Sequence, residues 1–245
     1  MVDEFQTPER VVTVSPGYAY VADTEVQRPK PVRAIENPAG TFRYRVLKRG
    51  LDVLLVLLFA PVLIPLLSVV AWAIVLTSKG PLFYSHRRIR KSGEFFSMWK
   101  FRTMCVNSTE VLEQYLATHP EARAEWNRCH KLKDDPRVTP VGGFLRRYSL
   151  DELPQLWNVL CGQMSLVGPR PIVAAEVEKY KDDFGYYCRV KPGLTGLWQV
   201  SGRSTLTYDQ RVALDCEYVR RWSLWMDLRI LWKTMFSVIR QDGAF

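Results

Sequence analysis

Two acidic residues stand side by side at Asp151 and Glu152, within the segment SLDELPQL at positions 149–156. The arginines Arg146 and Arg147 come shortly before them. A carboxylate that lies beside cations, and can share a divalent metal ion, has the chemistry needed to attack a phosphorus atom that carries its own negative charge. The pair is therefore the first candidate for a catalytic centre, and both carboxylates are candidate metal ligands.

Acidic residues at this place also have a structural explanation. Apolar residues follow at helical spacing, and Pro154 suits the first position of a helix, which puts the pair just outside the helix N-terminus. Acidic groups there complement the helix dipole, and Ser149 with Glu152 matches a capping box, although Pro154 would then fall too deep in the helix. This stretch alone leaves catalysis and capping both open.

A second candidate site is the segment MSLVGPRP at positions 164–171. Gly168 allows close backbone approach, Arg170 supplies a cation, and Pro171 suits the first turn of a helix that we expect to reach about Phe184. A glycine, an arginine and exposed helix amides together favour an anion such as phosphate. A turn bracketed by prolines is also a common structural feature, so this segment is weak evidence by itself.

The segment KPGLTGLWQVSGR at positions 191–203 is a third candidate. Its three glycines alternate with polar and aromatic residues, and a basic residue stands at each end. Such a loop can contact a ligand, although a structural turn explains it equally well.

The composition limits the class of protein. The 245 residues are 47% hydrophobic, enough for a real core, and the formal net charge is +9. This charge predicts an acidic partner: nucleic acid, an anionic membrane surface or a phosphorylated substrate. No zinc-ligand spacing or nucleic-acid motif accompanies it, so we expect no nucleic acid. The five cysteines are widely spaced without a CxxC pair, which indicates reduced thiols.

An uncharged apolar segment from Val53 to Ser78 has the length of a membrane helix. Pro61 and Pro65 lie near its middle, and each removes a helix hydrogen bond, so we expect a kink or break there. Both flanks are basic, and the positive-inside rule then places both ends on the cytoplasmic face. We favour a re-entrant helix that dips into one leaflet, with a kinked helix that spans the bilayer as the alternative.

The apolar segment divides the chain into three parts. Residues 1–40 contain five prolines and no sustained apolar period, which predicts a flexible cytoplasmic tail. Residues 41–80 form the membrane anchor with its basic flanks. Residues 81–245 form the domain on the cytosolic face.

Within the third part the sequence predicts few strands. We expect short strands at 82–84 and 95–101, and a helical surface insert at 107–133. Residues 208–240 are basic and rich in tryptophan, which suits amphipathic helices at a membrane interface, although these aromatic residues could also fill the core. The expected fold class is α/β to mainly α, a compact membrane-associated domain with an N-terminal helix-break-helix segment.

Three motifs together resemble a known family. They are KFRTM (100–104), DPRVTPVGGFLRRYSLDELPQLWNVLCGQMSLVGPRP (135–171) and PGLTGLWQVSGR (192–203). They resemble the bacterial sugar transferases, the polyprenyl-phosphate hexose-1-phosphate transferases also called small monotopic phosphoglycosyl transferases. The resemblance covers about residues 44–244 and includes Asp52, Asp215, Tyr218 and Asp227.

The resemblance implies an enzyme at the cytoplasmic face of the bacterial inner membrane. It would transfer a hexose-1-phosphate from a nucleotide diphosphate sugar to polyprenyl (undecaprenyl) phosphate and release the nucleoside monophosphate, UMP. This reaction begins the synthesis of an exopolysaccharide or another glycan. UDP-glucose and UDP-galactose are both expected donors, membrane lipids are further partners, and a homo-oligomer is compatible with this assignment.

The resemblance also implies residue roles. Asp151 would be the nucleophile that forms a covalent phosphosugar intermediate, and Glu152 would help to hold Mg²⁺ or position the reacting groups. The alternative is direct attack by polyprenyl phosphate, with Asp151 as a metal ligand only. The expected substrate-binding residues are Lys100, Arg102, Arg146, Gly168, Pro169, Arg170, Pro171, Thr195, Gln199 and Arg203.

Three positions depart from the family pattern. Ala60 stands where a serine is expected before the helix-breaking proline, and His86 and Arg90 stand where glutamine and glycine are expected. We expect His86 to be a solvated surface residue. A non-catalytic membrane adaptor is the competing hypothesis, and it predicts that Asp151 and Glu152 can be neutralised without effect.

Overall fold

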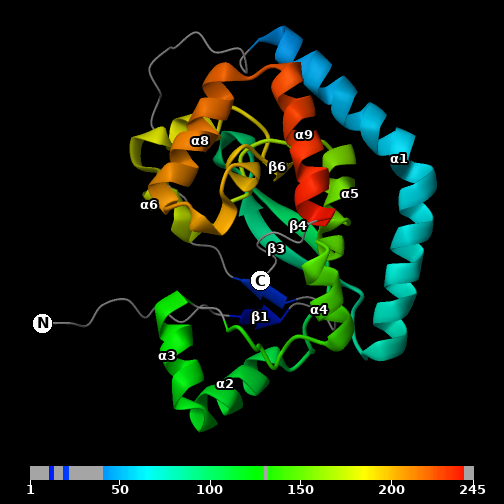
Figure 1. The fold of residues 1–245 in the computed structure, drawn as a ribbon, viewed down its shortest axis with the longest axis vertical. Helices are drawn as coiled ribbons and strands as arrows, with labels where there is room; N and C mark the ends of the chain where they lie inside the picture. Colours follow the sequence, from blue (N-terminus) through cyan, green and yellow to red (C-terminus); the bar gives the residue numbers. More distant parts are fainter. Residues whose placement is uncertain (1–10, 14–18, 22–40, 130–131, 240–245) are drawn as a thin grey trace, which may run out of the picture.

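The computed structural model describes residues 11–13, 19–21, 41–129 and 132–239. Helices surround a small amount of sheet, with α8 and α9 at one end of the molecule and α2 and α3 at the other (Figure 1). The helices are α1 (Phe42–Thr77), α2 (Ser108–Thr118), α3 (Pro120–Cys129), α4 (Pro140–Arg147), α5 (Gln155–Leu160), α6 (Val177–Tyr180), α7 (Phe184–Tyr187), α8 (Tyr208–Arg221) and α9 (Leu224–Ile239). The strands are β1 (Val11–Thr13), β2 (Ala19–Val21), β3 (Phe83–Ile89), β4 (Phe95–Phe101), β5 (Ser165–Val167) and β6 (Gly193–Thr195).

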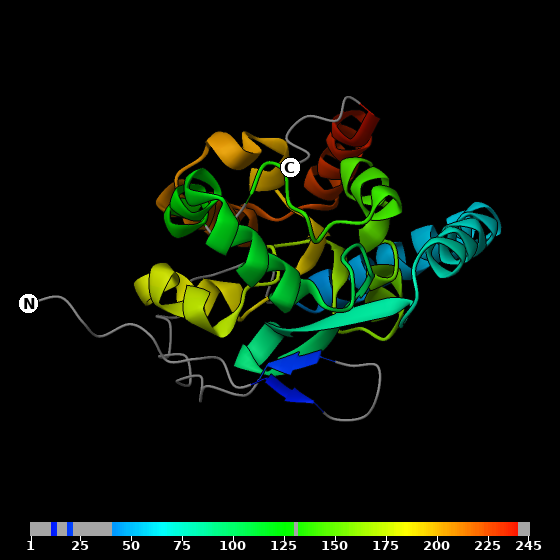
Figure 2. The same ribbon diagram turned by 90° about the horizontal axis from the view of Figure 1, so that it is seen from below.

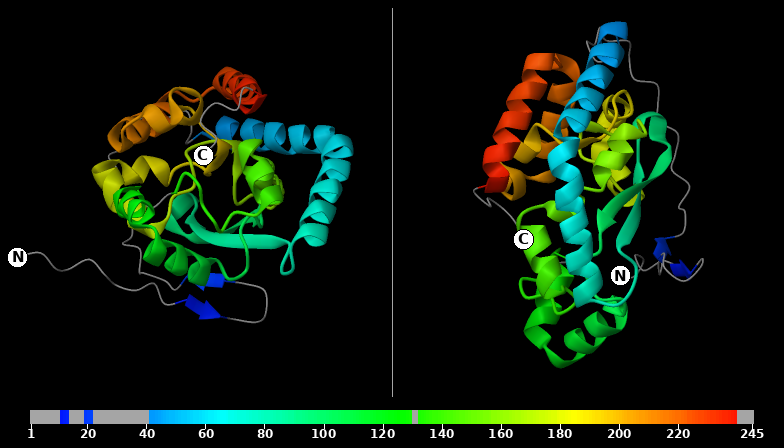
Figure 3. Two further views of the ribbon diagram at one scale, coloured as in Figure 1. Left: turned by 60° about the horizontal axis from the view of Figure 1, so that its bottom comes forward. Right: turned by 90° about the vertical axis from the view of Figure 1, so that its right-hand side faces the viewer.

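Helix α1 is long, apolar and bent. Thr41 caps its first turn by accepting a hydrogen bond from the Tyr44 amide, and both Pro61 and Pro65 lie inside the helix. The ribbon changes direction in its middle part, as expected where prolines remove helix hydrogen bonds (Figure 3). The predicted interruption is therefore a bend within one continuous helix. Among the described residues, α1 alone is long and apolar enough to cross a membrane.

The two halves of α1 pack against different parts of the protein, each along one side of the helix. Tyr44 and Val56 belong to the main core, whereas Val70 and Ile74 form a second apolar cluster with Phe101 and Leu145. The middle of the helix leaves large apolar side chains exposed on several sides, among them Leu54, Leu57, Leu58, Phe59, Val62 and Ile64. Such a surface requires an apolar environment, so the structure indicates membrane association.

The strands form three small two-stranded sheets. β3 and β4 make an antiparallel hairpin in which Tyr84 lies opposite Lys100 and His86 opposite Met98. β5 and β6 pair in parallel, and β1 and β2 form an antiparallel pair beside the hairpin (Figure 2). The predicted strand at 95–101 is confirmed, and the strand predicted at 82–84 is longer than expected, since β3 continues to Ile89. The rest of the predicted tail lies outside the described residues.

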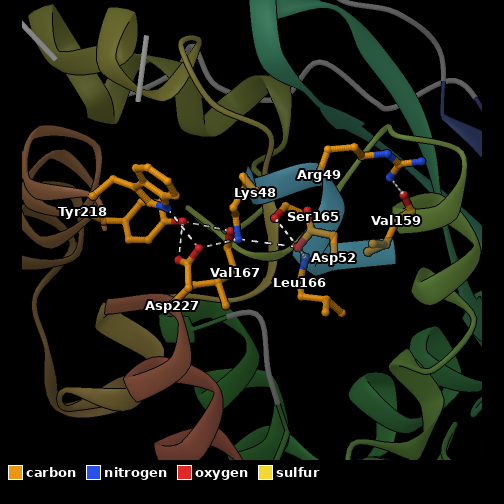
Figure 4. A network of polar contacts seen from close by, with 10 residues as sticks. Lys48, Arg49, Asp52, Val159, Ser165, Leu166, Val167, Tyr218 and Asp227 are labelled. Carbon is orange, nitrogen blue, oxygen red and sulfur yellow. Dashed lines mark hydrogen bonds and ion pairs between the residues drawn. The ribbon is translucent and has the colours of Figure 1, made fainter. Parts of the chain in front are cut away.

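A buried polar network connects α1 to β5 and to the C-terminal helices α8 and α9. The Lys48 ammonium forms ion pairs with Asp227 at 2.9 Å and with Asp52 at 3.5 Å (Figure 4). The Asp52 carboxylate also accepts hydrogen bonds from the Ser165 hydroxyl and the Leu166 amide. Asp227 accepts hydrogen bonds from two further side chains, those of Tyr218 and Trp222. These contacts join α1, β5, α8 and α9.

The C-terminal tryptophans divide between core and surface. Trp222 is buried and packs edge-on against Tyr44 at 4.6 Å, whereas Trp225 and Trp232 are 67% and 62% exposed on α9. Leu228, Met235 and Phe236 are exposed at helical spacing with them. α9 therefore presents an apolar face, as the amphipathic pattern predicts.

The predicted helix from Pro171 to about Phe184 is wrong. The segment instead consists of 3₁₀ turns at Ala174–Glu176 and Lys181–Asp183 together with the single turns of α6 and α7. Lys181 has a positive φ of 49°, which a regular helix does not accommodate. No helix N-terminus therefore presents its amides beside Arg170, because the first turn begins three residues after Pro171.

Candidate active site

The acidic pair lies in a tight turn between two helices. Asp151 and Glu152 belong to the 3₁₀ turn Leu150–Glu152, which connects α4 to α5. Ser149 enters this turn in the left-handed conformation with φ 55°, a strained geometry for a residue other than glycine. The Ser149 side chain makes no capping hydrogen bond, so the capping box is not formed. α5 begins at Gln155, one residue later than the sequence suggests.

Lys100 of β4 brings the hairpin against this turn. Its ammonium donates a hydrogen bond to the Glu152 carboxylate at 2.6 Å and lies 3.9 Å from the Asp151 carboxylate. Both carboxylates thus approach one cation, and Glu152 is 52 residues away from Lys100 in the sequence. The structure therefore brings together Lys100, Asp151 and Glu152 from the predicted set.

Arg146 of α4 is a second cation close enough to interact with the charge of Asp151. Its Nε donates a hydrogen bond to the Thr103 hydroxyl at 2.8 Å. Burial lowers the pKa of Arg146, whereas the negative charges of Asp151 and Asp135 act in the opposite direction. The Asp135 carboxylate is itself held by the Arg137 guanidinium at 2.6 Å. Neither Thr103 nor the pair of Asp135 and Arg137 was among the residues predicted from the sequence.

Burial controls the protonation of Asp151. Desolvation raises the pKa of this carboxyl to about 6; Lys100 and Arg146 lower it, and Glu152 raises it. The side chain is only 12% exposed. Asp151 can therefore be a nearly desolvated carboxylate that is still charged at neutral pH, and this state favours reaction with an electrophile.

A row of polar side chains extends from Lys100 along the same face of the hairpin. Tyr84, His86 and Arg88 alternate along β3, so all three point to the face that carries Lys100. The Arg88 guanidinium donates hydrogen bonds to the Pro171 carbonyl at 3.3 Å and to the His86 Nδ1 at 3.1 Å. Arg88 also lies 3.7 Å from the Glu176 carboxylate. The row therefore links the acidic pair to the loop at 168–171.

His86 is not the solvated surface residue that we expected. Burial lowers its pKa to about 4, and the positive charges of Arg88 and Lys100 act in the same direction. The residue is partly buried because the hairpin face that bears it is turned toward the rest of the domain. The imidazole is consequently neutral at neutral pH.

Arg170 joins a second cationic group at the far end of this row. Its guanidinium lies 5.9 Å from the ring centre of the buried Trp198, and that of Arg211 lies 4.9 Å from the same ring. Arg170 is exposed, and its positive charge lowers the pKa of Arg88. This group, Arg88, Arg170 and Arg211 with Trp198, suits an anion attached to a planar group. Arg88 and Arg211 were missed because neither lies in a motif.

The remaining loop residues form the backbone support of this group. The Gly168 amide donates to the Thr195 carbonyl at 2.9 Å, and the Gly193 amide donates to the Pro169 carbonyl at 2.8 Å. A Cβ at Gly168 would lie 2.5 Å from the Lys191 carbonyl oxygen, so the close approach that requires this glycine is to the neighbouring loop.

Three predicted residues make their described contacts elsewhere. The Arg102 guanidinium donates to the Ser78 and Lys79 carbonyls at 2.9 and 2.8 Å, and so holds the end of α1. Thr195 is buried, and its hydroxyl lies 2.7 Å from that of Thr234. Arg203 donates to the Gln199 carbonyl at 2.9 Å. The structure does not bring these side chains to Asp151, and their binding roles stay predictions.

The acidic pair fits a magnesium ion that is held mainly by a substrate. Both carboxylates approach the same Lys100 ammonium, so they can face a common ligand. The described residues contain no group of three or more histidine, cysteine or acidic side chains that could hold a metal by themselves. Mg²⁺ is commonly bound by one or two carboxylates, with substrate phosphates and water completing its shell.

Comparison with known proteins agrees with this chemistry. Residues 43–241 match the profile of the family described as bacterial sugar transferase. The chain is 51% identical over 211 residues to an undecaprenyl-phosphate galactose phosphotransferase of Salmonella typhimurium, with 86% of this chain and 44% of the relative covered. It is 52% identical over 215 residues to an uncharacterized sugar transferase of Haemophilus influenzae, with 86% and 45% covered.

A shorter relative matches over most of its length. It is an exopolysaccharide production protein of Sinorhizobium fredii, 48% identical over 198 residues, with 81% of this chain and 88% of the relative covered. The chain thus spans slightly less than half the length of the first two relatives. The family profile covers most of the chain, including the acidic pair with Lys100 and Arg146 and the group around Arg170. This protein therefore belongs to the bacterial sugar transferase family.

Proposed function

We propose that this protein transfers a hexose-1-phosphate from a nucleotide diphosphate sugar to undecaprenyl phosphate and releases UMP, and so initiates exopolysaccharide or other glycan synthesis. The observation that carries the proposal is the environment of Asp151, a buried carboxylate that lies 3.9 Å from the Lys100 ammonium and also interacts with the charge of Arg146. The cationic group around Arg170 lies along the same hairpin face and can receive the remainder of a diphosphate. The names of the Salmonella and Sinorhizobium relatives support the acceptor and the pathway.

The proposed reaction has two displacement steps at one phosphorus atom. In the first, an Asp151 oxygen attacks the phosphorus that bears the sugar, and the bond from this phosphorus to the bridging oxygen breaks. UMP leaves with the bonding electron pair. In the second, an oxygen of undecaprenyl phosphate attacks the same phosphorus and releases the Asp151 carboxylate, so the enzyme returns to its starting state.

The surrounding residues reduce the repulsion between the carboxylate and the diphosphate. Lys100 and Arg146 supply positive charge near Asp151, in a partly desolvated place where charges act more strongly. Asp151 and Glu152 would hold Mg²⁺ together with phosphate oxygens, and the ion would neutralise charge on the diphosphate. The donor sugar is proposed to be galactose or glucose, both as the UDP derivative.

One assay tests the proposed function. Purified protein in lipid nanodiscs is incubated with undecaprenyl phosphate and a panel of nucleotide sugars, and UMP release is measured. We expect release with UDP-galactose or UDP-glucose, its loss with EDTA, and its return with added Mg²⁺. Absence of UMP release across the panel would overturn the proposal, and release that is insensitive to EDTA would remove the magnesium part.

We further propose that α1 is re-entrant and that the catalytic domain lies at the cytoplasmic face of the inner membrane. Both ends of α1 pack on the same domain, Tyr44 on the main core and Ile74 on the smaller cluster, which supports placing them on one side of the bilayer. The exposed apolar face of α9, including Trp225 and Trp232, can rest at the interface. Such an arrangement brings Asp151 near the plane of the lipid phosphates.

Cysteine labelling checks this topology. A single cysteine introduced at Arg45 or at Lys79, on opposite sides of the apolar segment, should react with a membrane-impermeant maleimide only in inside-out vesicles. The native cysteines are first replaced by serine, and a cysteine at the exposed Asp182 is the cytoplasmic control. Opposite labelling of the two flanks would establish a spanning helix instead.

Activity should depend on pH through Asp151. Its pKa of about 6 places the charged nucleophile above that pH, so the rate of UMP release should fall about tenfold per pH unit below the pKa and stay level above it. The folded-state pKa is raised above the model-peptide value of 3.8, so ionisation of this group disfavours folding and lowering the pH through 6 toward 4 stabilises the protein at this site.

Lys100→Met provides the matched test of that assignment. Lys100 lowers the pKa of Asp151, so its removal should move the inflection of the rate profile to higher pH, besides lowering the rate above it. The profile is measured as kcat/KM for UMP release. An unchanged inflection in Lys100→Met would show that another group controls the profile.

A further inference from the structure

His86 lies between Lys100, which contacts the acidic pair, and Arg88, which contacts the loop at 168–171. It lies one cross-strand pair from Lys100 on the same face of the β3–β4 hairpin, because Tyr84 pairs with Lys100 and His86 with Met98. Diagonal neighbours of this kind are roughly 7–8 Å apart. On its other side His86 contacts Arg88, which is held by the Pro171 carbonyl and Glu176.

The contact with Arg88 fixes the tautomer of His86. A guanidinium can only donate hydrogen bonds, so the Nδ1 atom that lies 3.1 Å from the Arg88 Nη2 must accept one and carries no proton. Burial, and then the nearby charges of Arg88 and Lys100, oppose a second ring proton and lower the pKa to about 4. The single proton of the neutral imidazole is therefore on Nε2.

The Nε2–H group is available to a ligand. Within the part of the chain that the structure describes, no side chain or backbone group forms a hydrogen bond with Nε2. The groups on both sides of His86 are cations, so an acceptor that reaches this position is favoured if it is an anionic oxygen. A neutral sugar hydroxyl gains less from these charges than an anionic oxygen does.

We propose that His86 is a further substrate-binding residue, whose Nε2–H donates a hydrogen bond to a phosphate oxygen of the nucleotide half of the donor. This inference rests on the proposed function, which puts the sugar-bearing phosphorus at Asp151. The second phosphate of the diphosphate then lies along the hairpin face toward Arg88 and Arg170, over His86. The imidazole both contacts the phosphate and keeps Arg88 oriented toward it.

Two substitutions separate these contributions. In His86→Gln the amide nitrogen can reach the position of Nε2 and donate to the phosphate, whereas in His86→Asn the amide oxygen can reach the position of Nδ1 and accept from Arg88 but the donor is lost. Binding of UMP and of uridine to the full-length protein is measured by isothermal titration calorimetry, with turnover assayed in parallel. Thermal unfolding reports whether each variant is folded.

We expect His86→Asn to weaken UMP binding by about tenfold or more, the effect of one lost hydrogen bond to a charged group. Uridine lacks the phosphate, so its binding should be unchanged. His86→Gln should bind UMP within about threefold of the unmodified protein, well inside the effect of losing that bond. The matched control is His119→Gln, because His119 lies between α2 and α3 and stacks on Tyr115, away from the hairpin.

The outcomes distinguish this inference from the proposed function. UMP binding by His86→Asn equal to that of the unmodified protein would overturn the inference, as would failure of the unmodified protein to bind UMP. An equal loss in both variants, with uridine affected too, would show that His86 only supports the fold. If UMP binding follows the expected pattern but no nucleotide sugar releases UMP, the proposed function fails and the His86 contact stands.

Discussion

Replacing Asp151 with asparagine should abolish UMP release and prevent any phosphosugar from becoming attached to the protein. The amide is nearly isosteric but cannot serve as the nucleophile, and loss of a residue in this role typically lowers kcat by about 10³-fold or more. The fold should persist, because Asp151 is a buried charge whose desolvation raises its pKa and whose ionisation already costs stability. Intact-mass and peptide mass spectrometry after incubation with nucleotide sugar alone measures the adduct.

The controls identify what Asp151 does. Asp182→Asn changes an exposed aspartate outside the site and should retain full activity. Full activity of Asp151→Asn would eliminate the catalytic proposal and revive the adaptor hypothesis. An inactive Asp151→Asn combined with no adduct in the unmodified protein, and with intersecting double-reciprocal plots, would favour direct attack by undecaprenyl phosphate instead.

Lys48→Met should cause the largest loss of stability. Lys48 is 5% exposed and is the cation between Asp52 and Asp227, whose side chains are 1% and 0% exposed (Figure 4). Its removal leaves two carboxylates buried without their counter-ion, and breaking a buried ion pair in this way typically costs about 3–5 kcal/mol. Denaturation of the protein in detergent, followed by circular dichroism, should show the loss.

An exposed ion pair provides the comparison. Lys181 and Asp209 are 3.7 Å apart but 75% and 83% exposed, so Lys181→Met should change the free energy of unfolding by less than about 1 kcal/mol. If Lys48→Met is as mild as this control, the buried network does not hold α1 to the domain. A double variant that also converts Asp227 to leucine should recover part of the loss, since one of the two uncompensated charges is then removed.

Several features of the fold follow from local sequence patterns. The uncharged run with Pro61 and Pro65 determines a long bent helix, because apolar length and missing amide donors act within the helix itself. The hairpin strands follow from a β-rich stretch around a basic turn. The single helix expected after Pro171 failed because nothing in the local pattern shows that Lys181 takes a positive φ.

The site was less accessible to sequence reasoning because its contacts are distant in the chain. Asp151 and Glu152 could be recognised as chemically unusual, but only the structure shows that Ser149 forms no capping hydrogen bond and that Lys100 contacts Glu152. Arg88 lies outside the three motifs and His86 departs from the family pattern, so only their place on one face of the hairpin points to a role for them. Conversely, Arg102 lies in a motif but is used to hold the end of α1.

The sequence by itself therefore determined the candidate acidic pair, the apolar segment and the family resemblance, all of which depend on residue types within short windows. Only the tertiary structure decided which cations surround Asp151, and that Asp52 and Asp227 share Lys48 across the fold. The physical reason is that burial and charge–charge distance set the pKa of a carboxylate and the strength of an ion pair. Both quantities depend on neighbours brought together by folding, which periodicity and motif spacing do not specify.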